Sequence, residues 1–257
     1  MKIGKVEKYI NEEVEKHGSM LLPLIDPCDY PSPEDAIKTG KGIGEGGAGL
    51  ILVGGSIGAQ GALLDDVVKG VKEETGALIL LFPGNIASVT KYADALYFMS
   101  LVNSRNPYWI IQAQAAASFQ IKSLKLEPLP VAYMVTQPGG TVGWVGDANL
   151  IPVNKPSIAA GIALAAQYLG ARFIITDRGA GAEGPLPAEF IAKVAKSIDV
   201  TYIAGGGIKT PEQAEEIAKA GAHAMQIGSI YEKTPIDKIP ELTRQLIKRI
   251  REGAKNR

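Results

Sequence analysis

Tyr202-Ile203-Ala204-Gly205-Gly206-Gly207-Ile208 and Ala224-Met225-Gln226-Ile227-Gly228-Ser229 are two short apolar runs, each with small residues where its strand is expected to end. Because glycine has no Cβ, backbone N–H groups at such strand ends can approach a bound oxyanion closely. A helix start follows the first run, with Thr210 as its cap, Pro211 at its first position and Glu212 in its first turn. The loops after strands seven and eight of a (β/α)8 barrel often bind phosphate. The pair therefore predicts such a barrel and a phosphate site.

Apolar runs alternate with helical patterns along the chain, which is typical of a parallel sheet covered by helices. We expect strands at 20–25, 49–54, 77–82, 95–100, 129–135, 172–176, 200–204 and 222–228. We expect helices near 5–17, 33–45, 61–75, 107–122, 155–169, 187–197, 211–220 and 236–252. A chain of 257 residues has the usual length of one TIM barrel, so residues 1–257 are expected to form a single domain.

Two intervals depart from the regular pattern. Only about a dozen residues, beginning Pro83-Gly84-Asn85, separate the third and fourth strands, which is too few for two loops and a full helix. The third helix is therefore expected to be missing or reduced. The glycine-rich stretch 137–149 follows the fifth strand, and it is expected to form a loop or lid over the barrel mouth.

Charge and cysteine content exclude several classes of protein. Lysine plus arginine and aspartate plus glutamate number 27 each, so no basic surface indicates a nucleic-acid partner. The one cysteine, Cys28, is insufficient for an intrachain disulfide or a cysteine-rich zinc site. The N-terminal segment is charged and no window approaches about 18 apolar residues, so neither a signal peptide nor a membrane span is expected. A cytoplasmic enzyme is predicted, with at most peripheral membrane contact.

Function in a TIM barrel lies at the C-terminal ends of the strands. Strand one ends on Asp26, which is either a ligand for Mg²⁺, an ion that prefers hard oxygen donors, or a cap of the following turn. Strand two ends on Gly55-Ser56, where a hydroxyl faces the same metal or a diphosphate. Strand six ends on Asp177-Arg178. Asp177 is a candidate proton acceptor and Arg178 a candidate phosphate partner, unless the two simply pair with each other.

Strand four and its sequel, residues 97–111, are unusually aromatic for this chain. Taken alone, the composition favours core packing with an aromatic oligomer contact over a groove for a long hydrocarbon. The polar cluster 103–106 within the run argues for an amphipathic ligand instead.

In this order the motifs resemble the geranylgeranylglyceryl phosphate synthase family of archaeal lipid biosynthesis, which is related to bacterial heptaprenylglyceryl phosphate synthases. The similarity spans nearly the whole chain, in segments 24–27, 51–56, 81–85, 98–111, 138–148, 205–208 and 228–229. It implies a TIM barrel with one helix replaced. The implied reaction is Mg²⁺-dependent transfer of a geranylgeranyl group from geranylgeranyl diphosphate to the 3-hydroxyl of sn-glycerol 1-phosphate, the first ether bond of the lipid.

The resemblance also implies residue roles. Asp26 and Ser56 correspond to the magnesium-binding positions, and Asp177 occupies the position of a glutamate thought to activate the hydroxyl. The implied glycerol phosphate residues are Ile175, Thr176, Arg178, Gly179, Ala180, Gly181, Gly205, Gly206, Gly207, Gly228 and Ser229. The implied prenyl groove comprises Phe98, Tyr108, Trp109 and Tyr133, which reverses the preference for core packing. A homo-oligomer, dimer or hexamer, is implied too, and it favours an intersubunit contact for Trp144 over a lid or core position.

Three motifs depart from the family pattern. The family usually has Asp-Pro-Asp-Lys at 26–29, Glu-Pro-Gly-Gly at 137–140 and Glu-Ala-Gly-Ser-Gly at 177–181, where this chain has Asp-Pro-Cys-Asp, Gln-Pro-Gly-Gly and Asp-Arg-Gly-Ala-Gly. Aspartate in place of glutamate shortens the reach of a positioned base by one methylene. Two alternatives to the transferase follow: a homologue that binds phosphate or prenyl groups without turnover, and a phosphosugar isomerase or lyase that shares only the phosphate site.

Overall fold

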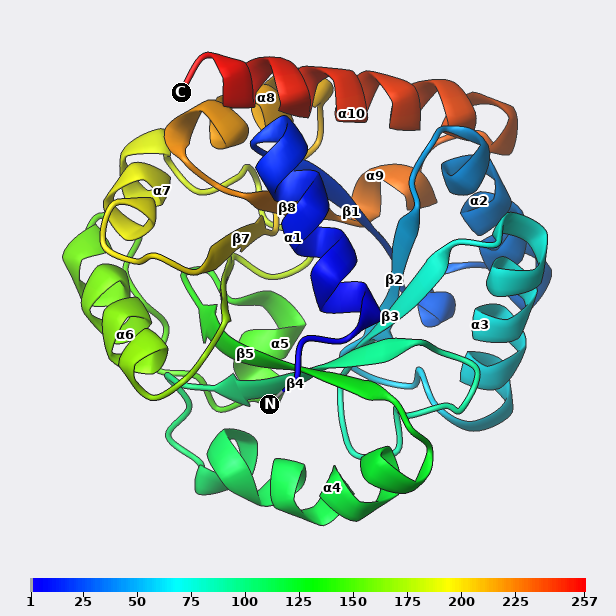
Figure 1. The fold of residues 1–257 in the computed structure, drawn as a ribbon, viewed down its shortest axis with the longest axis horizontal. Coiled ribbons are helices and arrows are strands. Elements are labelled where there is room, and N and C mark those ends of the chain that lie inside the picture. Colours follow the sequence, from blue (N-terminus) through cyan, green and yellow to red (C-terminus); the bar gives the residue numbers. More distant parts are fainter. Residues whose placement is uncertain (1) are drawn as a thin grey trace.

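A closed barrel of eight parallel strands forms the body of the molecule (Figure 1). The computed structural model describes residues 2–257. Its strands are β1 (Met20–Ile25), β2 (Leu50–Gly55), β3 (Leu78–Pro83), β4 (Ala95–Leu101), β5 (Glu127–Val135), β6 (Phe173–Asp177), β7 (Thr201–Gly205) and β8 (Ala224–Ile227). All eight predicted strands are present, and the pairing of β1 with β8 closes the barrel. The predicted TIM barrel fold is confirmed.

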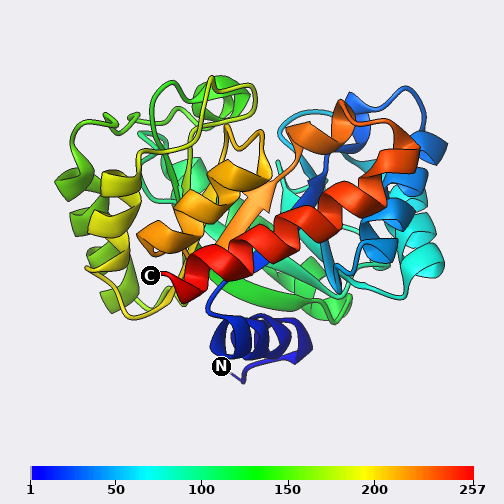
Figure 2. The ribbon, with the colours of Figure 1, turned by 90° about the horizontal axis from the view of Figure 1, so that it is seen from above.

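Helices surround this wall, and one of them closes the barrel at one end. They are α1 (Lys5–His17), α2 (Pro33–Glu45), α3 (Gly61–Thr75), α4 (Ala113–Ser123), α5 (Gly140–Val145), α6 (Pro156–Tyr168), α7 (Ala188–Ala195), α8 (Pro211–Ala220), α9 (Ser229–Glu232) and α10 (Ile239–Lys255). Helix α1 lies across the barrel (Figure 2), where Val6 and Ile10 are buried against the strand starts Met20 and Leu22. None of the helices in residues 2–257 is long and apolar enough to cross a membrane.

No helix separates β3 from β4 in the described chain, as the short interval predicts. Segment 84–94 makes the crossing instead. It is anchored at Asp94, whose carboxylate accepts hydrogen bonds from the Ile79 backbone N–H (2.8 Å) and from Lys72 Nζ (2.8 Å). The outer face of β4 therefore lacks one of the two helices that would flank it in a regular barrel.

The glycine-rich stretch 137–149 is not simply a loop, because it contains the short helix α5, and this corrects the sequence prediction. The helix follows Gly139, whose φ of +92° favours glycine. Asn103 fixes the segment from the end of β4, since its Nδ2 donates to the carbonyls of Val135 (2.8 Å) and Asn149 (2.9 Å). The stretch is thus tied to two strands beside the mouth.

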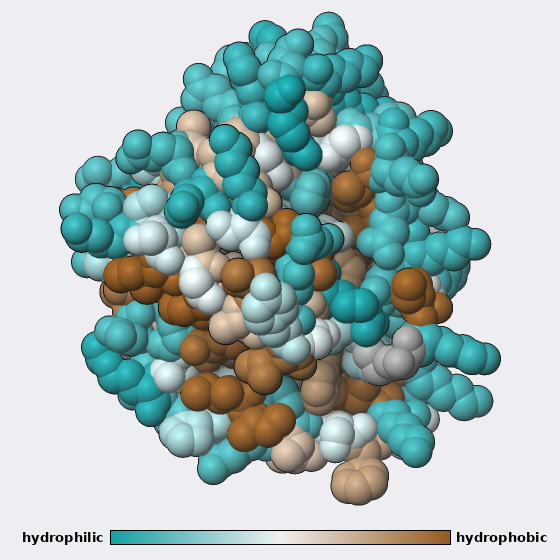
Figure 3. All heavy atoms as spheres, turned by 60° about the vertical axis from the view of Figure 1, so that its left-hand side comes forward, coloured by the Kyte–Doolittle hydropathy of each residue, from teal (hydrophilic) through white to brown (hydrophobic). Residues whose placement is uncertain are grey.

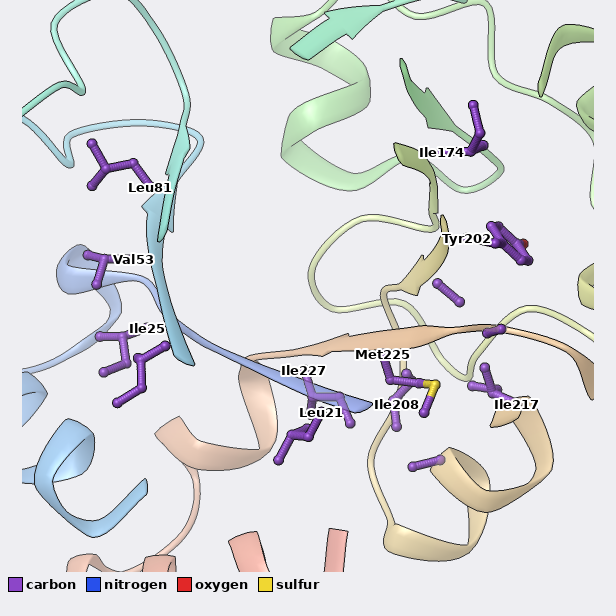
Figure 4. Packing of buried hydrophobic residues seen from close by; sticks show 14 of the residues in the cluster. Leu21, Ile25, Val53, Leu81, Ile174, Tyr202, Ile208, Ile217, Met225 and Ile227 are labelled. Atoms are coloured by element: carbon purple, nitrogen blue, oxygen red, sulfur yellow. The ribbon is translucent and has the colours of Figure 1, made fainter. Parts of the chain in front are cut away.

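The core has two layers, because side chains on each strand alternate between the barrel interior and the surrounding helices. Figure 4 shows part of the outer layer, to which Met225 and Ile227 of β8 contribute. Their neighbours on the same strand, Ala224 and Gln226, face the interior. This alternation decides which side chains reach the mouth.

Candidate active site

One continuous cavity begins at the C-terminal ends of the strands and extends along the outer face of β4. We call its first part the polar mouth, which is lined by Asp26, Ser56, Asp177, Gln226, Ser229 and Glu232. We call its second part the apolar groove, which is lined by Leu96, Phe98, Trp109, Ala113, Ala117 and Ile121. A ligand that fills both parts must have a polar head and a long apolar tail.

The apolar groove exists because of the missing helix. Leu96 and Phe98 point outward from β4, and in a regular barrel a helix after β3 would cover them. Here α4 supplies the facing wall, and its small side chains at Ala113 and Ala117 leave space against the strand. Ile121 stands further along α4 and away from the mouth, because the helix runs antiparallel to β4.

Asp177 lies at the end of β6 and is held by two hydrogen bonds. Its Oδ2 accepts from the Tyr133 hydroxyl (3.1 Å), and its Oδ1 accepts from the Gly179 backbone N–H (2.6 Å). The side chain is 7% exposed. Burial raises the pKa of this carboxyl above its usual range, and the two hydrogen bonds oppose that shift. The arrangement suits a group that accepts a proton from a bound hydroxyl.

Arg178 does not pair with its neighbour Asp177. Its guanidinium donates instead to three backbone carbonyls, those of Gln137 (3.2 Å), Gly184 (2.7 Å) and Pro185 (3.0 Å). These bonds tie the loop after β6 to the segment after β5. The alternative of an Asp177–Arg178 ion pair is therefore not what the structure shows.

The turn after β7 requires glycine. Gly206 and Gly207 have φ of +83° and +75°. A Cβ at Gly206 would lie 2.6 Å from Asp177 Oδ1, and one at Gly207 would overlap the carbonyl of Gly184. Both residues line the cavity, so their bare backbone is available to a ligand there.

Three carboxylates cluster on one side of the polar mouth. Asp26, Asp29 and Glu232 each offer an oxygen, and these oxygens lie within 4.8 Å of one another. Asp26 Oδ1 is shielded from solvent and has no hydrogen-bond partner. Burial, together with the charges of Asp29, Glu232 and Asp177, raises the pKa of Asp26 to about 7. An unpaired buried oxygen among hard carboxylate donors fits Mg²⁺, and Ser56 lines the same cavity.

The predicted prenyl residues separate into three positions. Phe98 and Trp109 line the apolar groove. Tyr133 faces the barrel interior instead, where its hydroxyl binds Asp177. Tyr108 is absent from the cavity lining within residues 2–257, and its ring packs edge-on against Trp109 with centroids 5.0 Å apart.

Only some of the predicted glycerol phosphate residues line the cavity. Those that line the cavity are Ala180, Gly206, Gly207, Gly228 and Ser229. Ile175 and Thr176 are fully buried in β6, where the Thr176 hydroxyl pairs with that of Tyr202 (2.7 Å) on the helix side. Arg178, Gly179, Gly181 and Gly205 are not part of the cavity lining, and Gly181 is exposed.

Sequence reasoning missed several residues of the mouth. Glu232 lies in the helical turn that begins at Ser229, and that turn carries it back over the end of β1 toward Asp26. Phe82 packs edge-on against Tyr97 and Tyr133, with both pairs of centroids 5.5 Å apart. Period-two alternation along β3 and β4 would have placed these rings inside the barrel.

The fold and the site together define a TIM-barrel protein whose mouth suits a phosphorylated head group and whose groove suits an apolar chain. The chain belongs to the PcrB family, which matches residues 12–246. The resemblance inferred from the motifs is confirmed at the level of the family.

Individual relatives agree with this assignment. Geranylgeranylglyceryl phosphate synthase of Pyrococcus abyssi is 48% identical over 99% of this chain and 100% of the relative. The crystal structure of (S)-3-O-geranylgeranylglyceryl phosphate synthase from Thermoplasma acidophilum, in complex with its substrate sn-glycerol-1-phosphate, has a TM-score of 0.91 at 31% identity and covers 98% of this chain and 100% of that one. The wild-type GGGPS from Thermoplasma volcanium has a TM-score of 0.89 at 36% identity, over 95% of this chain and 96% of that one.

Proposed function

We propose that the protein transfers a geranylgeranyl group from geranylgeranyl diphosphate to the 3-hydroxyl of sn-glycerol 1-phosphate. The observation that carries this proposal is the single cavity in which a polar mouth continues into an apolar groove. The relatives with this fold are named as synthases of the same product. The cytoplasm is the proposed compartment, in keeping with the single cysteine.

The residues of the polar mouth and the apolar groove have separate roles in this reaction. Asp177, oriented by Tyr133 and Gly179, accepts the proton of the 3-hydroxyl as that oxygen attacks the prenyl carbon. The backbone of Gly206 and Gly207 receives the phosphate of the acceptor. The prenyl chain lies in the apolar groove, where its burial excludes water from the reacting carbon.

Mg²⁺ belongs to this proposal as a cofactor. Asp26 and Ser56 would hold it, with Asp29 and Glu232 as further oxygen donors. When bound, the ion neutralises the charge of the diphosphate leaving group. Through the bound ion, Asp26, Asp29 and Glu232 would orient that group, which their own negative charges would otherwise repel.

The direct test is an ether-forming assay. Radiolabelled sn-glycerol 1-phosphate, geranylgeranyl diphosphate and Mg²⁺ are expected to yield an organic-extractable product. The absence of product at every enzyme concentration would favour the second candidate, a homologue that binds these ligands without turnover. The shorter Asp177 at the position of a family glutamate motivates that candidate, and gain of activity in Asp177→Glu would support it.

Filling the apolar groove is expected to change the preferred chain length. Ala117→Phe places a ring midway along the groove, so kcat/KM for geranylgeranyl diphosphate should fall at least about tenfold relative to that for the shorter farnesyl diphosphate. Ala116→Phe is the matched control, because Ala116 is exposed on the same helix. Equal losses with both donors would contradict the assignment of the groove.

We also propose that the protein is a homo-oligomer, dimer or hexamer. Trp144 is 83% exposed, which argues against the core position that its sequence left open, and Phe119, Tyr168 and Leu169 are at least 77% exposed. Figure 3 shows hydrophobic residues gathered on the side of the molecule that lies at the left in Figure 1. Such exposure of large apolar side chains is typical of an interface.

Removal of one such side chain is expected to reduce the assembly. In light scattering after size exclusion, Trp144→Ala should lower the measured mass by one assembly step, because an exposed tryptophan is a frequent interface anchor. Ile236→Ala, at a partly exposed site near α10, is the control. If the mass of Trp144→Ala equals that of the wild type, Trp144 does not contribute to the interface. If the wild type is a monomer, the proposal of a homo-oligomer is wrong.

A further inference from the structure

Three inward positions on adjacent strands form a row across the polar mouth. Asp177 of β6 pairs in register with Gly205 of β7, and Gly205 pairs with Gln226 of β8. The middle position has no side chain. A Cβ at Gly205 would lie 3.2 Å from Asp177 Oδ2 and 3.6 Å from Gln226 Cβ. Asp177 and Gln226 therefore border the same small gap, which the glycine leaves open.

Gln226 brings an unsatisfied polar group to this gap. Its side chain is 4% exposed, and its Oε1 is shielded from solvent without a hydrogen-bond partner. A buried amide oxygen without a partner destabilises the protein unless a ligand or water binds it. The amide carries both a donor and an acceptor, and so does a hydroxyl group, so the two can pair in either orientation of the amide.

The acceptor of the proposed reaction offers one polar group that no other residue has been assigned to bind. Its phosphate is assigned to the turn at Gly206 and Gly207, and its 3-hydroxyl to Asp177. The 2-hydroxyl lies on the carbon next to the reacting end. With the 3-hydroxyl at Asp177, the 2-hydroxyl on the adjacent carbon would lie near the gap beside Gly205, which Gln226 borders on the other side.

We propose that Gln226 binds the 2-hydroxyl of the polyol phosphate acceptor and selects acceptors that carry this group, an inference that rests on the proposed function. A site that hydrogen-bonds a substrate hydroxyl rejects an analogue without it, because the buried group of the site is then left unpaired. Gln226 is a specificity-determining residue in this scheme, and the proton transfer stays with Asp177.

The test compares two acceptors in a binding measurement that requires no turnover. Isothermal titration calorimetry measures the affinity for sn-glycerol 1-phosphate and for 3-hydroxypropyl phosphate, which lacks the 2-hydroxyl. The wild type is expected to bind the first at least about thirtyfold more tightly, and Gln226→Met, which keeps the length of the side chain, should reduce this ratio to about threefold or less. Gln226→Leu should do the same, and thermal melting confirms that both variants fold.

Two results would overturn the inference. The first is a wild type that binds the two acceptors with nearly equal affinity, and this result overturns the inference even if neither variant folds. The second is an equal loss of affinity for both acceptors in the variants, which indicates a purely structural role. Ether formation separates this inference from the proposed function. Product without discrimination between the acceptors refutes the role of Gln226 alone, and discrimination in binding without any product refutes the transferase alone.

Discussion

Asp177→Asn is expected to lower kcat for ether formation by about 10²- to 10⁴-fold, which is the usual contribution of a general base. Asparagine keeps the shape of the side chain and, with its one amide oxygen, one of the two hydrogen bonds that the carboxylate accepts, but it cannot accept a proton. Binding of glycerol phosphate should change about threefold or less, because the amide oxygen still accepts a hydrogen bond. Single-turnover kinetics and titration calorimetry separate these two effects.

The control for this substitution is Asp199→Asn, an exposed site that lies away from the cavity lining. A loss of binding as large as the loss of kcat would assign Asp177 to acceptor binding rather than to proton transfer. An unchanged kcat would show that Asp177 is not the general base.

The acid limb of the pH–rate profile gives a further check on the same residue. Only the ionised form of Asp177 accepts a proton, so the rate should fall as the pH drops through its pKa. Burial raises that pKa, and the hydrogen bond from Tyr133 lowers it. Tyr133→Phe removes the lowering contribution and should move the acid limb to higher pH. A limb that stays in place in Tyr133→Phe would contradict the coupling of these two residues.

The regular part of the fold could be predicted because it follows from local pattern. The period-two strands and the short interval after β3 are properties of neighbouring residues, and the interval predicts the missing helix by length alone. Helix α5 could not be predicted in this way. Its glycines favour a loop by composition, and the bonds that fix the stretch come from Asn103 at the end of another strand.

The candidate site shows the same division. Asp26, Ser56 and Asp177 were predicted because they stand at strand ends, and all three line the cavity. The partners of Arg178 were not predictable, because its guanidinium binds backbone carbonyls of its own loop and of the segment after β5. Glu232 was missed since only the turn of α9 brings it to Asp26.

Asp26→Asn is expected to have opposite effects on activity and on the stability of the metal-free protein. Activity should fall by about 10²-fold or more, because the variant loses the carboxylate that would hold Mg²⁺ beside the diphosphate. The stability of the metal-free protein should rise at pH 8. The pKa of Asp26 is about 7 in the folded protein and near 3.8 when unperturbed, so the folded state holds the proton more tightly. Between these values the native state binds more protons than the unfolded state, and stability is lost as the pH increases.

Asparagine carries no charge at any pH and escapes this loss, so thermal melting in chelator at pH 8 should give Asp26→Asn a midpoint several degrees above that of the wild type, on the order of 3–10 °C. At pH 4 the two midpoints should converge, because the wild-type carboxyl is then protonated in the folded state. Addition of Mg²⁺ at pH 8 should raise the wild-type midpoint and leave that of Asp26→Asn nearly unchanged, since binding to the native state stabilises it. Two results would contradict the assignment of Asp26, Asp29 and Glu232 as a cation site. One is a wild-type midpoint at pH 8 that does not change when Mg²⁺ is added. The other is a midpoint of Asp26→Asn in chelator that lies below that of the wild type.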